Sequence, residues 1–358
     1  MLYREAGQFK SSYAADSAIM PIRQDRIALV LILVVAFVGI PLTASPYLFS
    51  AILIPALILA LAALGLNILT GYAGQLSLGT AAFMAVGAFA AYNFALRIPG
   101  IPLLVAFAGG GIMAALVGIV FGLPSLRIRG FYLAVATLAA QFFILWCLTK
   151  VGWFTNHNPS GVITAQQMVI AGYAFDSPQE KYLLVLSIVT LMAFAAKNMA
   201  RGNIGRQWMA IRDMDVAAEV IGIRPMRAKL LAFAVSSFYC GVAGALFAYA
   251  YLGTVEPEAY SLDLSFRILF MIIIGGVGTV LGAFLGSAFI VIVPIALSIF
   301  VSFLDNTLHL GVPSSVGSNL QLMVFGGLII FFLVVEPEGL NRLWRNIRNY
   351  FRVWPFSY

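Results

Sequence analysis

The sequence predicts an all-α integral membrane protein with about ten transmembrane helices. The composition is the first reason: 62% of the residues are hydrophobic, 10% are charged, and the mean hydropathy is +0.98. Soluble domains carry roughly a quarter charged residues, so this chain has too few polar side chains to cover a water-exposed surface. The second reason is that the apolar residues fall into successive runs of about 20, the length that crosses a bilayer as a helix.

The candidate spans follow one another along the chain, separated by polar or glycine-containing turns. The first follows 26 mostly polar residues, which favours a retained signal-anchor helix over a cleaved signal peptide. Glycines separate the eighth span from the ninth, so this pair is either two tilted spans or one broken helix. The segment 71–80 is also rich in glycine and suggests a re-entrant turn. The spans are 27–44, 48–70, 75–96, 101–123, 130–149, 182–196, 229–252, 264–276, 278–303 and 319–335.

The basic residues predict the orientation, because loops on the cytoplasmic side of a membrane carry an excess of lysine and arginine. With the N-terminus inside, the inside segments hold seventeen such residues and the outside segments four, so both termini are expected in the cytoplasm. Topology thus explains the net charge of +7 better than nucleic-acid binding does. The long outside loop either caps the external mouth, meets a soluble partner, or is ordered without such a role. The predicted divisions are a cytoplasmic tail at 1–26, a transmembrane domain at 27–335 with an outside loop at 150–181 and an inside loop at 197–228, and a basic cytoplasmic tail at 336–358.

The inside loop contains the pattern of one short helix that lies outside the membrane. Asp213 is a suitable N-cap, Gly222 suits the C′ position because it tolerates positive φ, and Pro225 ends the helix. Small residues on this helix would let another surface approach closely. The helix therefore either docks against a protein partner or rests on an anionic membrane surface through its arginines. The alternation of acids with arginines argues against a simple membrane-surface role.

A group of neutral polar residues lies at membrane depth around the glycines of 71–80. Irregular backbone at this depth needs either protein or a watery cavity around it. The polar residues therefore either line a weakly binding path for a small solute or serve close helix–helix packing. Thr137 and Gln141 are weaker candidates of the same kind. The path candidates are Asn67, Thr70, Gly71, Gln75, Ser77 and Thr80.

The sequence lacks the residues that several kinds of chemistry would require. No Asp, Glu, Lys or His lies well inside a predicted span, which argues against a proton- or ion-coupled carrier. Cys147 and Cys240 are the two cysteines, and their positions in apolar runs exclude a disulfide framework and a Cys-rich metal site. No lysine follows a glycine, so no Walker A motif is present. We therefore expect that this chain is not an enzyme and holds no catalytic residue, metal site or cofactor.

Three sequence blocks carry a resemblance to a known family. The first is LGLNILTGYAGQLSLG at 64–79, followed by Thr80 where that family usually has histidine. The second is 205–222, in which Val216 stands where the wider importer superfamily often has glutamate. The third is GGVGTVLG at 275–282. In this order the blocks resemble the LivM-type permease subunits of the branched-chain amino-acid ATP-binding-cassette (ABC) importer family.

The resemblance implies one of two permease subunits of an ATP-driven importer in the bacterial inner membrane. The implied partners are a sister permease of LivH type, two ATPase subunits of LivG and LivF type that hold ATP and Mg²⁺, a periplasmic solute-binding protein and membrane lipid, without nucleic acid. The expected solute is a branched-chain or other hydrophobic amino acid, with urea, an amide or a small carboxylate as alternatives. A stand-alone channel or secondary carrier is the alternative of another class. The resemblance also implies a coupling helix that docks on an ATPase through Gly205, Arg206, Ala210, Arg212, Asp213, Asp215, Ala217, Ala218 and Gly222.

Overall fold

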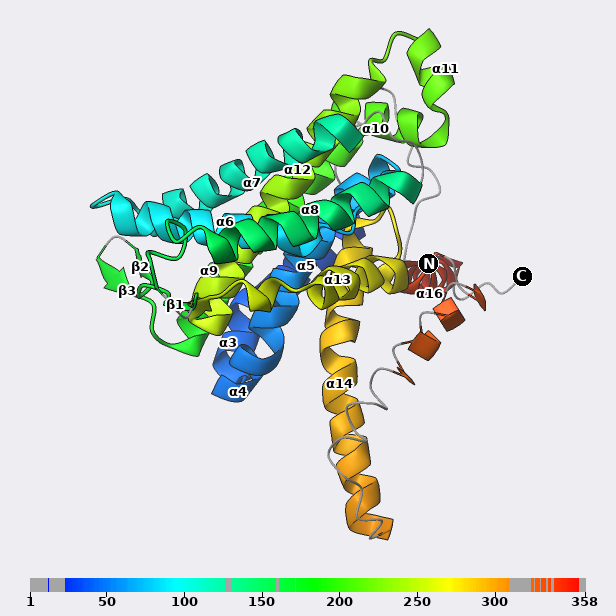
Figure 1. Cartoon of the computed structure of the whole chain (residues 1–358). Coiled ribbons are helices and arrows are strands. Elements are labelled where there is room, and N and C mark those ends of the chain that lie inside the picture. The colour runs from blue at the N-terminus through cyan, green and yellow to red at the C-terminus, as the bar shows by residue number, and fades with distance from the viewer. Residues whose placement is uncertain are drawn as a thin grey trace.

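The computed structural model is mostly helical, in agreement with the predicted fold class. It describes residues 12, 23–125, 131–158, 161–170, 172–308 and 323–353, the last range without 325, 329, 333, 336 and 337. Most of the predicted tail 1–26 therefore lies outside the described residues. The short strands β1, β2 and β3 lie at one end of the helical bundle, and α10, α11 and α16 lie at the other (Figure 1).

The bounds of the elements follow the chain. The α-helices are α2 (Arg23–Val34), α3 (Ile40–Thr43), α4 (Pro46–Leu48), α5 (Ile54–Asn67), α6 (Thr80–Arg97), α7 (Leu103–Ser125), α8 (Phe131–Lys150), α9 (Pro178–Arg201), α10 (Asn203–Asp213), α11 (Asp215–Val220), α12 (Pro225–Leu246), α13 (Leu262–Gly275), α14 (Val280–Leu308) and α16 (Leu340–Val353). The π-helical turns are η1 (Val35–Gly39), η2 (Phe49–Leu53), η3 (Ile68–Tyr72) and η4 (Phe247–Leu252), and η5 (Glu258–Tyr260) is a 3₁₀ turn. The strands are β1 (Ile163–Thr164), β2 (Val169–Ile170), β3 (Tyr173–Ala174) and β4 (Thr254–Val255).

Among the described residues, 7 helical stretches are long and apolar enough to cross a bilayer, and each coincides closely with a predicted span. Two further predicted spans also correspond to helices. Helix α6 begins at Thr80 rather than at residue 75 and has 18 residues, and α13 has 14 residues. Fourteen residues of helix span about 21 Å, less than the roughly 30 Å of the hydrocarbon core. The predicted span 319–335 is described only in part, at residues 323–335 without 325, 329 and 333, so the total of about ten stays a prediction. The 7 stretches are Arg26–Thr43, Pro46–Tyr72, Leu103–Leu123, Tyr132–Lys150, Pro178–Arg201, Pro225–Leu252 and Val280–Val301.

Helices α5 and α12 form the centre of the bundle. Their apolar stretches are 78% and 72% buried, whereas the stretch that begins at Arg26 is 0% buried. Helix α12 approaches α6 at glycines: a Cβ on Gly87 would lie 2.1 Å from the carbonyl oxygen of Gly241, and one on Gly244 would lie 1.9 Å from that of Met84. No larger residue permits these approaches, which bring the helix backbones into direct contact, as is common in membrane helix packing.

The chain from residue 262 to 308 forms two separate helices joined by a tight turn. This region is therefore not one broken helix, which was one of the two alternatives that the sequence left open. Helix α13 ends at Gly275, and Gly276 and Gly278 adopt positive φ angles of 117° and 79° in the turn. Helix α14 then returns along α13, because a Cβ on Gly286 would lie 1.8 Å from the carbonyl oxygen of Met271. Beyond this contact α14 extends out of the bundle (Figure 1).

The outside segment 150–181 is ordered where it is described. Strand β1 pairs with β4 in antiparallel fashion, and β2 pairs with β3. The Arg97 guanidinium lies 3.7 Å from the centre of the Trp153 ring, and Arg97 Nη2 donates a hydrogen bond to the Trp153 carbonyl oxygen at 2.7 Å. These contacts hold the segment over the end of α6.

Candidate functional site

The polar residues predicted around 71–80 lie at a break between α5 and α6, which we call the helix break. Helix α5 continues as η3 to Tyr72, and the backbone is then irregular until α6 begins at Thr80. Gly74 adopts a φ of 68°, in the left-handed region that side chains other than glycine's rarely adopt. The glycine-rich interruption is therefore present and lies within protein. Its buried polar side chains are Asn67, Gln75, Ser77 and Thr80.

Helix α6 begins inside the bundle, where its first backbone N–H groups need protein acceptors in place of water. Gln141 Oε1 accepts a hydrogen bond from the N–H of Ala82 at 2.7 Å, and Ser265 Oγ accepts one from Ala81 at 2.9 Å. Thr137 Oγ1 accepts a third, at 2.9 Å, from the irregular segment. Thr137 and Gln141 thus support the start of α6. The sequence analysis missed Ser265, because no local pattern shows which helix this serine faces.

Asn67 clamps the helix break to the turn between α13 and α14. Its Nδ2 donates a hydrogen bond to the carbonyl oxygen of Thr279 at 2.8 Å, and its Oδ1 accepts one from the N–H of Gly278 at 2.7 Å. Both ends of the buried amide are used within the protein. These contacts favour the packing alternative over the path-lining alternative for Asn67.

The other path candidates divide by their contacts. Thr70 Oγ1 donates to the carbonyl oxygen of Gln75 at 3.1 Å, and Ser77 Oγ accepts from the N–H of Gly79 at 3.3 Å, so both bonds are local to the break. Gln75 Oε1 and Thr80 Oγ1 are buried without a hydrogen-bond partner in the described part of the chain. A buried polar atom left without a partner costs about 1–3 kcal/mol, so these two atoms are the ones suited to meet water or a solute.

Arg212, near the end of α10, joins the inside loop to the helix break. Its Nη1 donates a hydrogen bond to the carbonyl oxygen of Gly71 at 2.8 Å, and its Nε donates one to Asp213 Oδ1 at 2.9 Å. A Cβ on Gly71 would lie 2.4 Å from the backbone nitrogen of Gly278, and one on Gly74 would lie 2.8 Å from Arg212 Cγ. Close contact of the three segments therefore requires glycine at these positions.

The helix break, the inside loop and the α13–α14 turn thus meet at one place, although their bonded residues are 141 and 211 positions apart in sequence. Each segment belongs to a different one of the three sequence blocks. We call this meeting place the junction and define it by Asn67, Gly71, Arg212, Gly278 and Thr279.

The inside loop forms two helices, α10 and α11, which corrects the predicted single helix. Asp213 ends α10 and is not an N-cap; Met214 occupies that position before α11, without a side-chain cap. The Asp213 carboxylate pairs with Arg212 instead, because that cation lies beside it. Gly222 follows α11 with a φ of 90°, in keeping with the predicted C′ role. Pro225 starts α12 and does not merely end the loop helix.

The predicted docking residues of the loop differ in exposure. Gly205 is buried, because a Cβ there would lie 2.1 Å from the carbonyl oxygen of Ala200 at the end of α9. Ala218 is buried and Ala210 partly so, and Asp215 Oδ2 lies 3.8 Å from Lys229 Nζ on α12. These residues position the loop from within. The exposed members are Arg206, Arg212, Asp213, Ala217 and Gly222.

Trp208 fixes α10 against α12 and was missed by the sequence analysis. Its side chain is buried, and its Nε1–H donates a hydrogen bond to the carbonyl oxygen of Ala228 at 2.9 Å. A single tryptophan in a polar loop was the available signal, since burial of its ring needs a partner surface.

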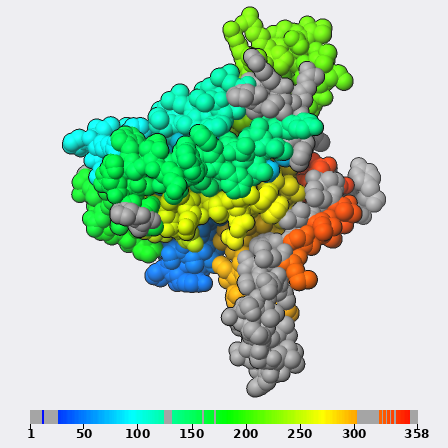
Figure 2. All heavy atoms as spheres, viewed as in Figure 1, coloured from blue at the N-terminus to red at the C-terminus, as the bar shows by residue number. Residues whose placement is uncertain are grey.

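The outer surface of α11 carries large exposed apolar side chains that the sequence analysis did not single out. Their exposed fractions run from 63% for Val216 to 83% for Val220. Figure 2 shows α11 and its neighbours projecting from one end of the molecule. Exposed apolar clusters of this kind mark interaction sites. We call the surface the α11 tip; it consists of Met214, Val216, Ala217, Val220 and Ile221.

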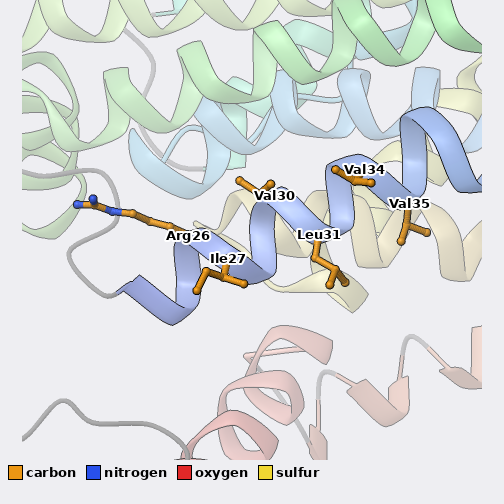
Figure 3. Close-up of a pocket in the computed structure, with 6 residues that line it drawn as sticks. All are labelled: Arg26, Ile27, Val30, Leu31, Val34 and Val35. Carbon is orange, nitrogen blue, oxygen red and sulfur yellow. The ribbon is translucent and has the colours of Figure 1, made fainter.

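A hollow of about 550 Å³ lies elsewhere, along the exposed helix α2. All of its lining residues come from the one stretch 26–35, and Figure 3 shows their side chains projecting from different sides of that helical stretch. We therefore assign this hollow to the lipid-facing surface. Within the described residues no group of three or more His, Cys, Asp and Glu is placed to hold a metal ion. The lining residues of the hollow are Arg26, Ile27, Val30, Leu31, Val34 and Val35.

Comparisons with known proteins give concordant results. The family model described as "Branched-chain amino acid transport system / permease component" matches residues 48–333. The high-affinity branched-chain amino acid transport system permease protein LivM of Escherichia coli (strain K12) is 29% identical over 302 residues, which are 77% of this chain and 66% of that protein. The probable LivM of Methanocaldococcus jannaschii is 25% identical over 242 residues, 66% of this chain and 68% of that protein.

A relative with a different name is the autoinducer 2 import system permease protein LsrC of Enterobacter sp. (strain 638), 26% identical over 227 residues and 62% of either chain. The chain thus spans about two thirds of the length of the curated relatives it matches. No solved structure matches it. Because the family model covers most of the sequence, the chain belongs to the permease component family of branched-chain amino acid transport systems, whose members are multi-pass membrane proteins.

Proposed function

We propose that this chain is a permease subunit of an ATP-driven importer and forms half of the translocation path for a small solute. The observation that carries this proposal is the junction, in which Arg212 of the inside loop binds the carbonyl oxygen of Gly71 at the helix break. A force applied to α10 and α11 from outside the membrane reaches the interrupted helix through this bond. Coupling between distant sites requires such a contiguous element that both sites contact.

The α11 tip is the surface proposed to meet an ATPase subunit. It is apolar and exposed, with Arg206 and Arg212 on the adjoining helix α10. An apolar centre with a charged rim is the usual composition of a protein–protein interface. ATP and Mg²⁺ would bind to the partner subunits. The movement of those subunits would then displace α10 and α11 of this chain.

The solute path is proposed to pass beside the start of α6. There, Gln75 Oε1 and Thr80 Oγ1 are buried and have no hydrogen-bond partner in the part of the chain that the structure describes. The α6 N-terminus also carries a partial positive charge from its aligned peptide dipoles. Neutral polar groups and a helix dipole suit weak binding of a zwitterionic solute, which must be released on the other side.

The proposed solute is a branched-chain or another hydrophobic amino acid, in line with the printed names of the LivM relatives. The proposed assembly contains a homologous sister permease, two ATPases and a periplasmic binding protein in the inner membrane. Relatives named for autoinducer 2 import belong to the same comparison, so the solute has to be tested separately from the importer class.

The test of the class is purification of the full chain from its native membrane in mild detergent, followed by identification of the proteins recovered with it. We expect a second permease and ATPase subunits, and solute uptake that needs ATP after reconstitution. Recovery of this chain alone, with flux in vesicles in the absence of ATP, would establish a stand-alone channel or carrier instead.

The test of the α11 tip is the substitution Ala217→Arg. A long cation in the centre of an apolar contact should prevent recovery of the ATPases and abolish uptake, with membrane insertion unchanged. Ala217→Ser is the matched control and should retain both. Wild-type uptake by Ala217→Arg would remove α11 from the ATPase interface.

A further inference from the structure

The C-terminal helix α16 is unlike the other helices of this protein in its distribution of side chains. Its apolar residues recur at spacings of three and four, which places them on one face of a helix. Three arginines, Arg342, Arg345 and Arg348, recur at the same spacing and form the opposite face. Most of the apolar face is exposed, with exposed fractions of 42% to 67%. The exposed residues of that face are Leu343, Trp344, Ile347 and Tyr350.

The start of α16 is fixed to the rest of the protein. Gly339, with a φ of 66°, lies where a Cβ would be 2.7 Å from the backbone nitrogen of Gly276. A Cβ on Gly276 would lie 2.6 Å from the carbonyl oxygen of Glu338, and Leu340 packs against the hydrophobic core. The helix therefore leaves from the α13–α14 turn, and after its first turn Leu343, Trp344 and Ile347 remain 42% to 51% exposed.

The location of this anchoring point determines which end of the bundle α16 occupies. Gly276 lies two residues from Gly278, the junction residue whose N–H is bound by Asn67. Helix α16 consequently lies at the same end of the molecule as α10, opposite the strands (Figure 1). Because α9 ends at Arg201 and α12 begins at Pro225 at this end, we expect the surface of the bilayer here.

We propose that α16 lies in the plane of the membrane surface beside α10 and binds an anionic lipid leaflet. Its apolar face would enter the boundary between headgroups and acyl chains, and its arginines would bind lipid phosphates. This inference does not depend on the proposed importer function.

Two observations favour lipid over a protein partner. Trp344 and Tyr350 belong to the exposed apolar face, and these two residue types concentrate at membrane–water interfaces. The arginines accompany the apolar face along the described length of the helix, as expected for contact with a uniform charged surface. By comparison, the apolar face of α11 has acidic Asp215 and Glu219 in the same helix, which an anionic leaflet would repel.

Charge determines the expected strength of the lipid contact. Arg345 is paired with Glu338, so part of its charge is already balanced within the chain. Arg348 is the better site for substitution. Each basic residue at an anionic leaflet shifts the equilibrium toward the bound form by about fivefold.

The experiment places a nitroxide label on each face of α16 in the full chain. The variants Ile347→Cys and Asn349→Cys carry the label in a Cys147→Ser background, since Cys240 is buried and unreactive. The protein is reconstituted in phosphatidylcholine vesicles with or without phosphatidylglycerol. Collision of the label with oxygen, which dissolves in the acyl region, is compared with collision with a water-soluble nickel chelate.

In vesicles with phosphatidylglycerol we expect the label at position 347 to collide mainly with oxygen and the label at 349 mainly with the nickel chelate. Omission of phosphatidylglycerol, or the substitution Arg348→Gln, should lower the membrane-bound fraction at 347. A label at 347 that meets the nickel chelate in both vesicle types would overturn the proposal. Shielding of 347 from both reagents would also overturn it, because that result means cover by protein.

A control label at Val220→Cys on the α11 tip separates this inference from the proposed function. In this chain without partners, it should meet the nickel chelate. If it meets oxygen instead, α11 rests on the leaflet and the ATPase docking proposal fails, while the result at 347 still decides the role of α16.

Discussion

The junction and the α11 tip share the inside loop, because Arg212 of the junction lies two residues before Met214 of the tip, but they differ in how many of their contacts are made within the protein. At the junction every contact is made within the protein: Asn67 bonds to the α13–α14 turn, Arg212 bonds to Gly71, and the glycine backbones leave no space. At the tip, Val216 and Val220 expose most of their side chains to the surroundings. The contacts of the junction are therefore made within the chain, whereas the tip is an exposed apolar surface that needs a partner.

This difference predicts two kinds of mutational effect. Changes at the junction should lower the stability of the isolated chain, because they break contacts that exist without partners. Changes at the tip should leave the isolated chain stable and weaken its association. The four predictions below test this division in order of decreasing effect on stability.

The largest effect is expected for Gly71→Ala. The added Cβ would lie 2.3 Å from Asn67 Oδ1 and 2.4 Å from the backbone nitrogen of Gly278, so the backbone has to move. We expect a loss of about 3 kcal/mol or more, seen as aggregation on mild heating in detergent. Gly326→Ala is the control, because a Cβ there meets nothing within 4 Å. Equal stability of the two variants would mean that the junction is not tightly packed.

The second effect concerns Asn67→Ala, which leaves the N–H of Gly278 and the carbonyl oxygen of Thr279 without their partners. The expected loss is about 2–4 kcal/mol, measured by thermal unfolding in detergent. Asn93→Ala removes a similarly buried amide whose Nδ2 donates only to carbonyl oxygens and whose Oδ1 has no partner in the described residues. It should cost less. The reverse order would show that Asn67 does not clamp the turn.

The third effect is that of Arg212→Gln, which removes a charge-assisted hydrogen bond to Gly71. Its side chain is 39% exposed, so we expect a modest loss of about 1 kcal/mol. Uptake should fall steeply even though the ATPases are still recovered with the chain. Arg227→Gln changes an exposed arginine of α12 that belongs to neither the junction nor the α11 tip, and serves as the control. Normal uptake by Arg212→Gln would remove this bond from the coupling route.

The smallest effect on stability is expected for the double substitution Val216→Ser and Val220→Ser. Both side chains are exposed, so the stability of the isolated chain should change by less than about 0.5 kcal/mol. Recovery of the ATPases should nevertheless fall, because the apolar centre of the contact is lost. Destabilisation equal to that of Asn67→Ala would show that the tip packs within the chain and does not await a partner.

The sequence predicted the helices because apolar length and glycine position are local properties. Seven spans and the irregular segment before Thr80 follow from them directly. The prediction that Asp213 is an N-cap was wrong, and the cause is equally local. An N-cap preference competes with an adjacent arginine, and the pairing with Arg212 prevailed. The exposure of the α11 valines was not predicted, because the sequence of a short helix does not show whether other parts of the chain cover its apolar residues.

By itself, the sequence determined that this chain is a helical membrane protein, which seven segments of its described part are long and apolar enough to cross a bilayer, and where the polar and glycine residues interrupt the helices. Tertiary structure alone decided that Gly71, Arg212 and Gly278 meet, that Asn67 is used in packing, and that Gln75 Oε1 and Thr80 Oγ1 are buried without a hydrogen-bond partner among the described residues. The physical reason is that hydrophobic length acts on each segment separately. A buried hydrogen-bonding group, in contrast, needs a partner within about 3 Å. That partner can lie far away in the sequence, and the glycines at the packed contact decide which backbone comes this close.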